Sequence, residues 1–390
     1  MQTLPSSSRY PVVILGQGLT ALSCGHHLLK LGCKDFIICG PSSQKTSSES
    51  SPGAVTGGLW GNFSRTHHAF GASLAKELWQ FGHNSFDSLK NYCQHSRLSW
   101  EQGRRTRFIC SPEELREAEQ AVAALGQAGF SSRLLPPDFA PDATEKFFGI
   151  QDDGQRAAVC NPDELMAQLR EELKDRIITK KACLLETLKD QSTSITLEKN
   201  AKAEAEILVL ACHLGAIQLI SGLRNILIPV ADQWSEHTIT SVPDPFGAWL
   251  SPGQVLSLKH GYNWLICQGE KTFAMGGGRY MRKLAGTGDA TPSYEPDIEK
   301  HLAGFFSRYF PLFKDSLPGR QEAYPDIYPC DELPLIGPLP GQERVLIGTG
   351  YMNQGLSMGF FAGKCLAELI YTGESMALPR HLWPTRLRSL

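Results

Sequence analysis

A short apolar segment followed by a glycine turn near the N-terminus constrains the fold more than any other feature. The run Val12–Leu15 predicts a buried strand, and Gly16–Ala21 then has the spacing G-x-G-x-x-A. The pattern of a helix continues from Ala21 to Leu31, and Phe36–Ile38 predicts a second strand. A strand, a glycine turn, a helix and a strand in this order are typical of a dinucleotide-binding βαβ unit.

Each residue of this turn has a physical task in such a unit. Gly16 permits the tight turn, Gly18 lets the backbone approach a pyrophosphate, and Ala21 keeps the helix close to the strand. The N–H groups of Leu19 and Thr20 lie at the helix N-terminus, where the helix dipole favours an anion. We therefore predict that these five residues bind a dinucleotide cofactor, and the alternative is a purely structural glycine turn.

Composition excludes several other classes of protein. The 390 residues carry a formal net charge of -2, which gives no electrostatic support for nucleic-acid binding. No apolar run approaches the roughly 20 residues of a membrane span. The 11 cysteines are scattered without a C-x-x-C pair, which predicts reduced thiols and no metal site. We expect a cytoplasmic protein without a transmembrane segment, and peripheral association with a membrane stays open.

The remaining patterns predict an α/β domain that is interrupted by a β-rich insertion. Residues 41–52 form a Ser-rich loop, helices follow at 69–94 and 112–126, and strand patterns recur from 177 to 211. The stretch 226–281 has mostly β patterns, 294–310 is helical, and 344–350 is again a strand entering a glycine turn. We assign residues 1–90, 150–228 and 325–390 to the nucleotide-binding domain, and 91–149 and 229–324 to a substrate or cap domain.

Taken together, these segments resemble the D-amino-acid-oxidase-like superfamily of FAD-dependent oxidoreductases, which includes glycine oxidase, sarcosine oxidase and D-amino acid dehydrogenase. The most specific resemblance is at the C-terminal end, where D-x-L-P-x-I-G is followed by a glycine turn and a helix. The segments that carry the resemblance are Ile14–Ala21, Ser51–Leu59, Val159–Leu165, Asp331–Pro338, Ile347–Ser357 and Ala362–Ile370.

The resemblance implies a glutathione-reductase-type, Rossmann-like FAD-binding domain with a β-rich substrate domain inserted. It implies non-covalent FAD, because Cys330 does not match the cysteine that sarcosine-oxidase-like members attach to flavin. Beyond the first glycine turn, the cofactor-binding residues that it predicts are Cys39, Gly57, Gly58, Leu59, Leu185, Gly350, Tyr351, Met352, Asn353, Gln354, Gly355 and Leu356.

Two departures from the family pattern concern the cofactor. Family members usually end the second strand with Glu or Asp, which accepts hydrogen bonds from the ribose hydroxyls, whereas this chain has Cys39. A thiol is a poor acceptor, so one or two charge-assisted hydrogen bonds of about 1.5–3 kcal/mol each are lost. Cys212-His213 replaces the Ala-x-Gly turn of the family, and His213 is either a plain turn residue or a functional one.

Two further departures concern the substrate. Amino acid oxidases of the family hold the substrate carboxylate with arginines at the places where this chain has Asp326 and Asn353. Arg279 is a candidate replacement, and its alternative is a solvent-facing residue at a strand end. Tyr328 completes the candidate substrate pocket of Asp326, Arg279 and Asn353.

The resemblance implies an FAD-dependent oxidase or dehydrogenase that removes a hydride from the C–N bond of a small amine or amino acid. The electron acceptor would be oxygen, a quinone or another carrier. One alternative is an oxidase of the tRNA-uridine-modification type, which the lack of a basic stripe disfavours. Another is a degenerate flavin-binding member with a non-catalytic role, for which Cys39 and His213 are the motive.

Overall fold

The chain forms two compact units in the computed structural model, which describes residues 8–41, 45–137, 143–242 and 246–387. The first unit comprises Met1–Glu49, Pro162–Pro229 and Asp326–Leu390, and the second comprises Ser50–Asn161 and Val230–Pro325. Residues 50–90 and 150–161, which the sequence analysis assigned to the nucleotide-binding domain, are thus grouped with the second unit. Residues 42–44 of the predicted Ser-rich loop lie outside the described residues.

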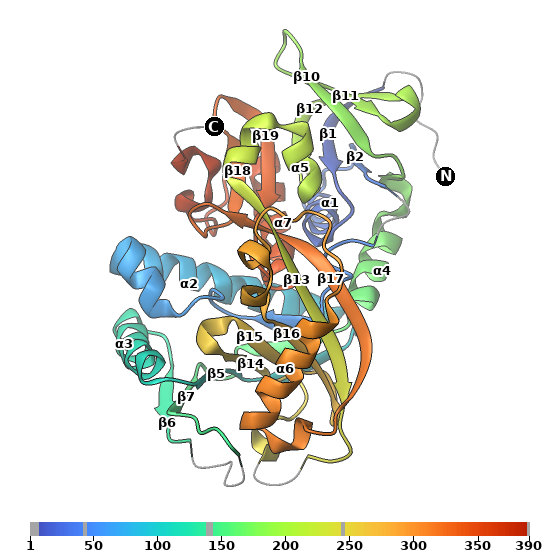
Figure 1. Cartoon of the computed structure of the whole chain (residues 1–390). Helices are drawn as coiled ribbons and strands as arrows, with labels where there is room; N and C mark the ends of the chain where they lie inside the picture. Colours follow the sequence, from blue (N-terminus) through green and yellow to red (C-terminus); the bar gives the residue numbers. More distant parts are fainter. Residues whose placement is uncertain (1–7, 42–44, 138–142, 243–245, 388–390) are drawn as a thin grey trace. The chain divides into compact units, whose positions relative to one another are not determined.

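The first unit is built on a parallel sheet whose central strand is the one that precedes the glycine turn (Figure 1). Its parallel neighbours lie in the order β9-β2-β1-β12-β19. These strands are β1 (Ser8–Leu15), β2 (Phe36–Cys39), β9 (Ile177–Ile178), β12 (Lys202–Leu210) and β19 (Gln342–Thr349). The strand predicted at residues 344–350 therefore joins this sheet next to β12.

Three antiparallel strands complete this sheet. β10 (Ala182–Thr187) pairs with β11 (Thr193–Leu197), which pairs with the first half of β12, and β18 (Leu335–Leu339) pairs with β19. The first part of the strand patterns that recur from 177 to 211 has no break before residue 188, but the structure divides it into β9 and β10. The division follows from a tight turn in which the Lys180 N–H donates to the Ile178 carbonyl over 2.9 Å.

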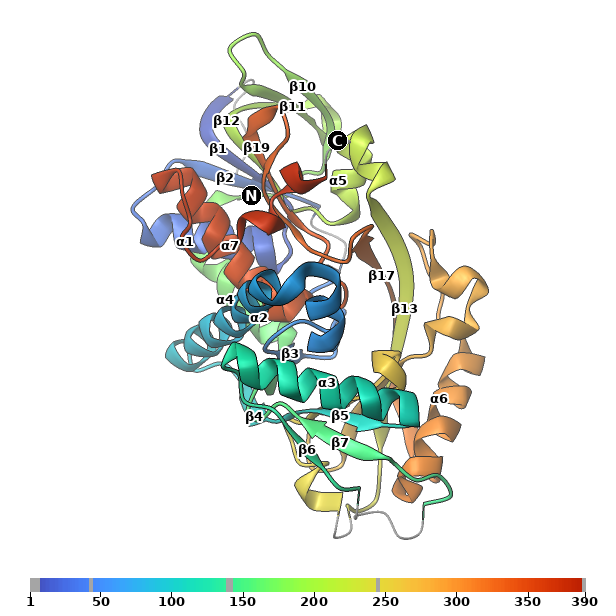
Figure 2. The same ribbon diagram turned by 90° about the vertical axis from the view of Figure 1, so that its left-hand side faces the viewer.

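Helices of the first unit pack closely because small residues line their contact. α1 (Leu19–Lys30) lies against α7 (Gly355–Thr372), and it also contacts α4 (Pro162–Leu173) (Figure 2). A Cβ on Gly363 would lie 2.7 Å from the Cys24 nitrogen, so α7 approaches the backbone of α1 itself. The short helix α5 (Leu214–Leu219) follows β12. No described helix is long and apolar enough to cross a membrane.

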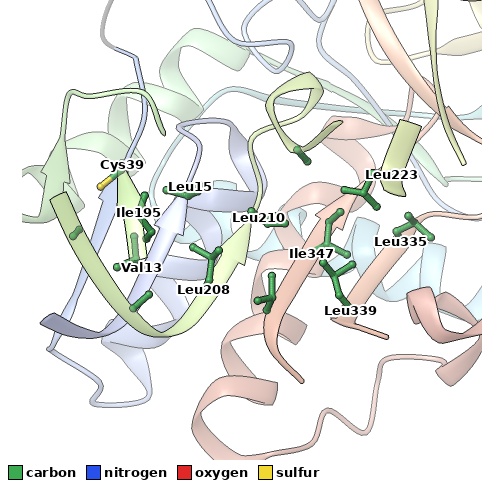
Figure 3. Packing of buried hydrophobic residues seen from close by; sticks show 14 of the residues in the cluster. Val13, Leu15, Cys39, Ile195, Leu208, Leu210, Leu223, Leu335, Leu339 and Ile347 are labelled. Atoms are coloured by element: carbon green, nitrogen blue, oxygen red, sulfur yellow. The ribbon is translucent and has the colours of Figure 1, made fainter. Parts of the chain in front are cut away.

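An apolar cluster fills one face of the parallel sheet. Its labelled members in Figure 3 come from the strands and from the segment around Leu223, and they are Val13, Leu15, Cys39, Ile195, Leu208, Leu210, Leu223, Leu335, Leu339 and Ile347. The side chains alternate along β1, since Val13 and Leu15 face this cluster. Because the cluster joins both ends of the chain, it fixes the loops at the carboxyl ends of the strands.

The second unit contains a mixed sheet in the order β17-β13-β16-β15-β14-β5-β7-β6. β14 and β5 run parallel, and the other pairs from β13 to β6 are antiparallel. The strands are β5 (Arg105–Ile109), β6 (Arg133–Leu135), β7 (Gly149–Asp152), β13 (Leu227–Thr238), β14 (Val255–Leu258), β15 (Asn263–Cys267), β16 (Thr272–Gly277) and β17 (Leu317–Pro329). The predicted α/β fold class, with a parallel nucleotide-binding type of sheet and a second β-rich part, is confirmed.

Helices cover the second unit, and a small sheet lies beside them. α3 (Pro112–Ala128) packs on β5 and β7 (Figure 2), and α6 (Pro296–Tyr309) packs on β16 (Figure 1). α2 (Phe63–His95) is interrupted at Gly71, whose φ of 78° is not helical. The small sheet has the order β3-β8-β4, with β3 (Ala54–Thr56), β8 (Ala157–Cys160) and β4 (Trp100–Gly103).

Candidate cofactor-binding site

Gly16 lies where the carboxyl ends of β1, β2 and β12 meet. Its φ is +126°, and its N–H donates to the Cys39 carbonyl over 2.8 Å. The Ala211 N–H donates to the Leu15 carbonyl over 2.9 Å, and a Cβ on Gly16 would overlap the Ala211 carbonyl oxygen. Glycine is required here by the protein's own backbone. The turn therefore has a structural reason for its first glycine, independent of any ligand.

Gly18 is different, because the protein leaves space around it. It has a φ of −77°, which any residue adopts, and a Cβ there would meet the Ser48 Oγ at 3.7 Å and nothing closer. The chain itself thus gives no steric reason for glycine at this position. A ligand that must approach the backbone gives one.

The N-terminus of α1 offers N–H groups at the same place. The first helical hydrogen bond runs from the Leu22 N–H to the Gly18 carbonyl over 3.1 Å, so the N–H groups of Leu19, Thr20 and Ala21 precede it. The Ser48 hydroxyl accepts from the Leu19 N–H over 3.1 Å. A pyrophosphate suits this end of the helix, because it accepts hydrogen bonds and its charge complements the helix dipole.

A buried hydroxyl pair links α1 to the loop that precedes α7. The Thr20 hydroxyl donates to the Tyr351 hydroxyl over 3.0 Å. Burial raises the pKa of Tyr351, so its hydroxyl stays protonated at neutral pH. Both residues were predicted to bind the cofactor, and the structure brings their side chains together.

The loop from Gly350 to Asn353 has an unusual backbone. Gly350, Met352 and Asn353 have φ values of 80°, 48° and 63°, and the left-handed region is uncommon for a methionine. The Asn353 N–H donates to Asp326 Oδ2, and the Ile327 N–H donates to Asp326 Oδ1 over 2.7 Å. The side-chain amide of Asn353 also donates, through Nδ2, to the Tyr328 hydroxyl over 3.3 Å. Three of the four candidate substrate residues therefore contact one another.

His213 lies beside this group. It follows β12 with a φ of 51°, and its Nε2 lies 3.8 Å from Asp326 Oδ1. Its Nδ1 lies 3.4 Å from the Ser47 hydroxyl. From the sequence, His213 is either a plain turn residue or a functional one. In the structure it lies between two other segments of the first unit, those of Ser47 and Asp326.

Cys39 and Leu185 are two predicted cofactor residues in the first unit, of which Cys39 is buried in the core and Leu185 is partly exposed at its edge. Cys39 is 1% exposed and packs with Val13 and Leu15 (Figure 3), and burial raises the pKa of its thiol to about 12. Leu185 lies in β10 opposite Ile195 and packs against the same cluster. The Cys39 thiol is therefore protonated and in apolar surroundings, which does not suit a ribose hydroxyl.

The second glycine segment, Gly57–Leu59, lies in the second unit and is held by a buried arginine. The Arg105 guanidinium donates to the carbonyls of Gly57 and Leu59, stacks on the Trp79 ring at 5.1 Å, and lies 3.6 Å from the Asp153 carboxylate. Burial lowers the pKa of Arg105 to about 9, so it is charged at neutral pH. Sequence reasoning missed Arg105, because an arginine within a strand gives no signal that its side chain is buried.

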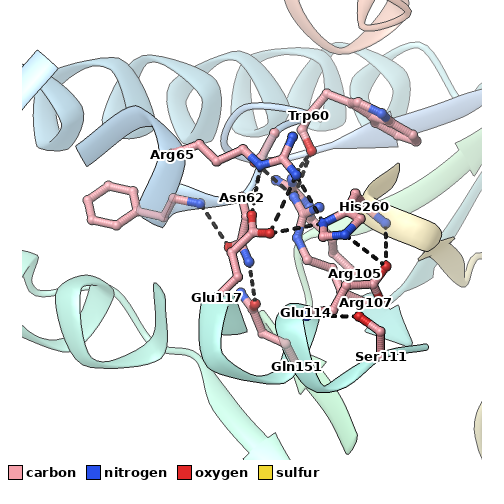
Figure 4. Close-up of polar contacts among 12 residues, drawn as sticks. Trp60, Asn62, Arg65, Arg105, Arg107, Ser111, Glu114, Glu117, Gln151 and His260 are labelled. Atoms are coloured by element: carbon pink, nitrogen blue, oxygen red, sulfur yellow. Dashed lines mark hydrogen bonds and ion pairs between the residues drawn. The ribbon is translucent and has the colours of Figure 1, made fainter. Parts of the chain in front are cut away.

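Arg107 extends this support along the chain. Its guanidinium donates to the carbonyls of Trp60 and Gly61 over 2.7 and 2.9 Å (Figure 4). Arg65, Glu117 and His260 form a polar group beside it (Figure 4). The cavity next to Arg107 has a volume of about 30 Å³, which accommodates about two water molecules and no substrate.

Arg279 lies in the second unit, in a short turn after β16. Its guanidinium lies 5.4 Å from the Tyr262 ring centre.

In the first unit, the D-x-L-P segment has a structural explanation, since Arg386 binds the Asp331 carboxylate through two nitrogens over 2.6 and 3.0 Å. Among the described residues, no group of three or more His, Cys, Asp or Glu residues is placed to hold a metal ion.

Comparison with known protein families identifies one match. The family model described as FAD dependent oxidoreductase (DAO) matches residues 11–369. No curated protein sequence matches the chain.

Solved structures share the fold at low sequence identity. L-proline dehydrogenase from P. horikoshii has a TM-score of 0.77 at 16% identity, over 99% of both chains. Glycine oxidase from Geobacillus kaustophilus has a TM-score of 0.76 at 14% identity, over 97% of this chain and 99% of that one. Iminodiacetate oxidase from Chelativorans sp. BNC1 has a TM-score of 0.74 at 16% identity, over 96% of this chain and 98% of that one. With the family model matching most of its length, the chain belongs to the DAO family of FAD-dependent oxidoreductases.

Proposed function

We propose that this protein binds FAD non-covalently and oxidises a C–N bond of a small amine or amino acid. Membership of the family supports the cofactor and the reaction class. The observation that carries the proposal is the space around Gly18 at the N-terminus of α1, because the protein itself leaves glycine unexplained there. The buried Cys39 indicates that the ribose is held without a carboxylate at that position.

When bound, the flavin supplies the hydride acceptor. In this proposal the N–H groups of Thr20 and Ala21 bind the pyrophosphate, while the Leu19 N–H donates to the Ser48 hydroxyl. Thr20 and Tyr351 hold the loop before α7 against α1. The N–H groups of Gly355 and Leu356, at the start of α7, favour negative charge next to that helix end.

The substrate class follows from the groups that replace arginine. Asp326 carries the opposite charge to the guanidinium that holds a substrate carboxylate in amino acid oxidases of the family, and Asn353 is neutral. Both oxygens of Asp326 accept from backbone N–H groups, so Asp326 would act on a substrate through its charge and not through a direct contact. We propose that secondary or cationic amines are better substrates than glycine, D-alanine and sarcosine. A repulsion of about 1.4 kcal/mol on the carboxylate is enough for a tenfold loss in binding. Arg279 is the alternative carboxylate anchor.

The proposed partners are a small substrate and an electron acceptor, either oxygen or a quinone or similar carrier. We propose a cytoplasmic location, because all 11 cysteines are free thiols in this structure and a reducing compartment keeps them so.

Absorbance spectroscopy of the purified protein tests the proposal. A flavin spectrum that bleaches anaerobically with a secondary amine, and more slowly with glycine or D-alanine, is the expected result. The same measurement on Arg279→Leu examines the alternative anchor, since that variant should bleach like the parent.

One observation favours a second candidate function, a flavin-binding member without catalysis. The side chain at the usual ribose-binding position lies in the core. A flavin spectrum that no amine bleaches would support this second candidate, and a protein that binds no flavin would contradict both.

A further inference from the structure

We propose that Asp326 is a positioning residue for the Gly350–Asn353 loop, and that its charge makes the bound flavin harder to reduce. The second part rests on the proposed function. Asp326 stands where the family has an arginine, so its natural interpretation is a substrate-facing carboxylate. The contacts of its two oxygens indicate a different role.

Both oxygens of Asp326 are used by the backbone of the first unit. Oδ1 accepts from the N–H of the next residue, Ile327, over 2.7 Å. Oδ2 accepts from the N–H of Asn353, which is 27 residues further along the chain. The side chain is 13% exposed, so little of the carboxylate is left for a ligand. Asp326 therefore joins the end of β17 to the loop before α7.

The loop needs such support because its conformation is costly. Met352 and Asn353 both have positive φ values, and a non-glycine residue in this sparsely populated region persists only where its surroundings hold it. A charged acceptor on the Asn353 N–H is a strong hydrogen-bond partner at the point of strain. The Asn353 side chain is held separately by the Tyr328 hydroxyl.

The charge of Asp326 is only partly offset. Among the described residues, the basic side chain within 4 Å of the Asp326 carboxylate is that of His213, whose Nε2 lies 3.8 Å from Oδ1. That distance exceeds a hydrogen bond, so it gives no direct neutralisation. The carboxylate thus places a negative charge beside the Asn353 N–H, two residues before α7 begins.

The consequence concerns the reduced flavin. The family resemblance implies that the C-terminal element lines the flavin ring, whose reduced form carries negative charge near N1. The N–H groups at the start of α7 favour that charge, and a nearby carboxylate opposes it. Removing the charge of Asp326 should therefore favour reduction.

Two substitutions separate position from charge. Asp326→Asn keeps the shape and one of the two acceptor oxygens but removes the charge, and Asp326→Ala removes both acceptors. Asp35→Asn is the matched control, because Asp35 is exposed and precedes β2, at the opposite end of that strand from its carboxyl-end loop. The readouts are hydrogen exchange of the Asn353 amide and the midpoint potential of the bound flavin.

For position, we expect backbone amide exchange at Asn353 to become at least tenfold faster in Asp326→Ala and to change less in Asp326→Asn, which keeps one acceptor oxygen. Unchanged exchange in Asp326→Ala would overturn the positioning role. This readout needs no flavin, so it tests Asp326 even if the proposed function fails. If Asp326→Ala does not fold, the melting of Asp326→Asn decides: melting within a few degrees of the parent supports the role, and a collapse of Asp326→Asn as well overturns it.

For charge, we expect Asp326→Asn to favour reduced flavin about tenfold, which is about 30 mV more positive for a two-electron couple. Asp35→Asn should match the parent. A potential in Asp326→Asn equal to the parent's, or more negative, would overturn the effect of the charge. A parent protein that holds no flavin contradicts the proposed function and this part together, while the exchange measurement stays independent.

Discussion

At the residue scale, Gly16 and Gly18 have separate explanations although one spacing joins them. Gly16 is fixed by a positive φ and by the Ala211 carbonyl, so the fold alone requires it. Gly18 has an ordinary φ and open space, so the fold does not. The spacing treats the two glycines alike. The structure separates them, because the fold explains Gly16 and leaves Gly18 without a structural reason.

Cys39 gives a prediction at the same scale. Its thiol packs in the apolar cluster, so Cys39→Val should keep the flavin affinity within about twofold and change the free energy of unfolding by less than about 1.5 kcal/mol. The measurements are flavin titration and denaturant unfolding. A loss of flavin affinity of tenfold or more with unchanged stability would show that the thiol contacts the cofactor.

At the element scale, the contact between α1 and α7 depends on glycines. A Cβ at Gly363 would lie 2.7 Å from the Cys24 nitrogen, the Ser23 Cβ and the Thr20 carbonyl oxygen. A Cβ at Gly355, in the same helix, would meet nothing within 4 Å. The close approach brings the loop before α7 next to α1, where Tyr351 reaches Thr20.

We therefore predict that Gly363→Ala lowers the free energy of unfolding by about 1–3 kcal/mol through overpacking against backbone atoms. Gly355→Ala is the matched control and should leave stability within about 0.5 kcal/mol. Thermal and denaturant unfolding of the two variants measure this. Equal stability of both would mean that the two helices are further apart than described.

Much of the first unit could be predicted from sequence because its signals are local. The apolar run before Gly16 gave β1, and the segment before Gly350 gave β19. The division between β9 and β10 could not be predicted, since it depends on a turn hydrogen bond at Lys180.

The candidate site was predictable only as a set of positions. The partners of Asp326 could not be inferred, because they depend on which backbone N–H groups the fold brings to it. The burial of Arg105 depends likewise on the tertiary contacts with Gly57 and Trp79.

At the scale of the whole molecule, each unit contains a histidine that is kept neutral by burial. His27 in the first unit packs at the α1–α7 contact, where its ring centre lies 5.1 Å from that of Phe360, and burial lowers its pKa to about 3. His83 in the second unit lies 5.0 Å from the Phe130 ring, and burial lowers its pKa to about 4.

These shifts predict a loss of stability in acid. Because the folded pKa values lie below the unfolded value of about 6.5, the unfolded state binds protons first as the pH falls from about 6.5 towards 4. We expect each of the two histidines to lower the free energy of unfolding by about 1–2 kcal/mol at about pH 5 relative to pH 7.5. His27→Gln and His83→Gln should lose less stability over this interval than the parent. His68→Gln, at an exposed position, should lose as much as the parent.

The central claim is that a dinucleotide flavin binds at the N-terminus of α1, and flavin retention in Gly18→Val tests it most directly. The valine finds only the Ser48 hydroxyl nearby, so the variant should fold and melt like the parent. Its side chain would occupy the space of the pyrophosphate, so the purified variant should retain less than a tenth of the parent's flavin. Gly126→Val, at an exposed position in α3 with nothing within 4 Å, is the control and should retain all of it. A folded Gly18→Val protein with the flavin content of the parent would contradict the account.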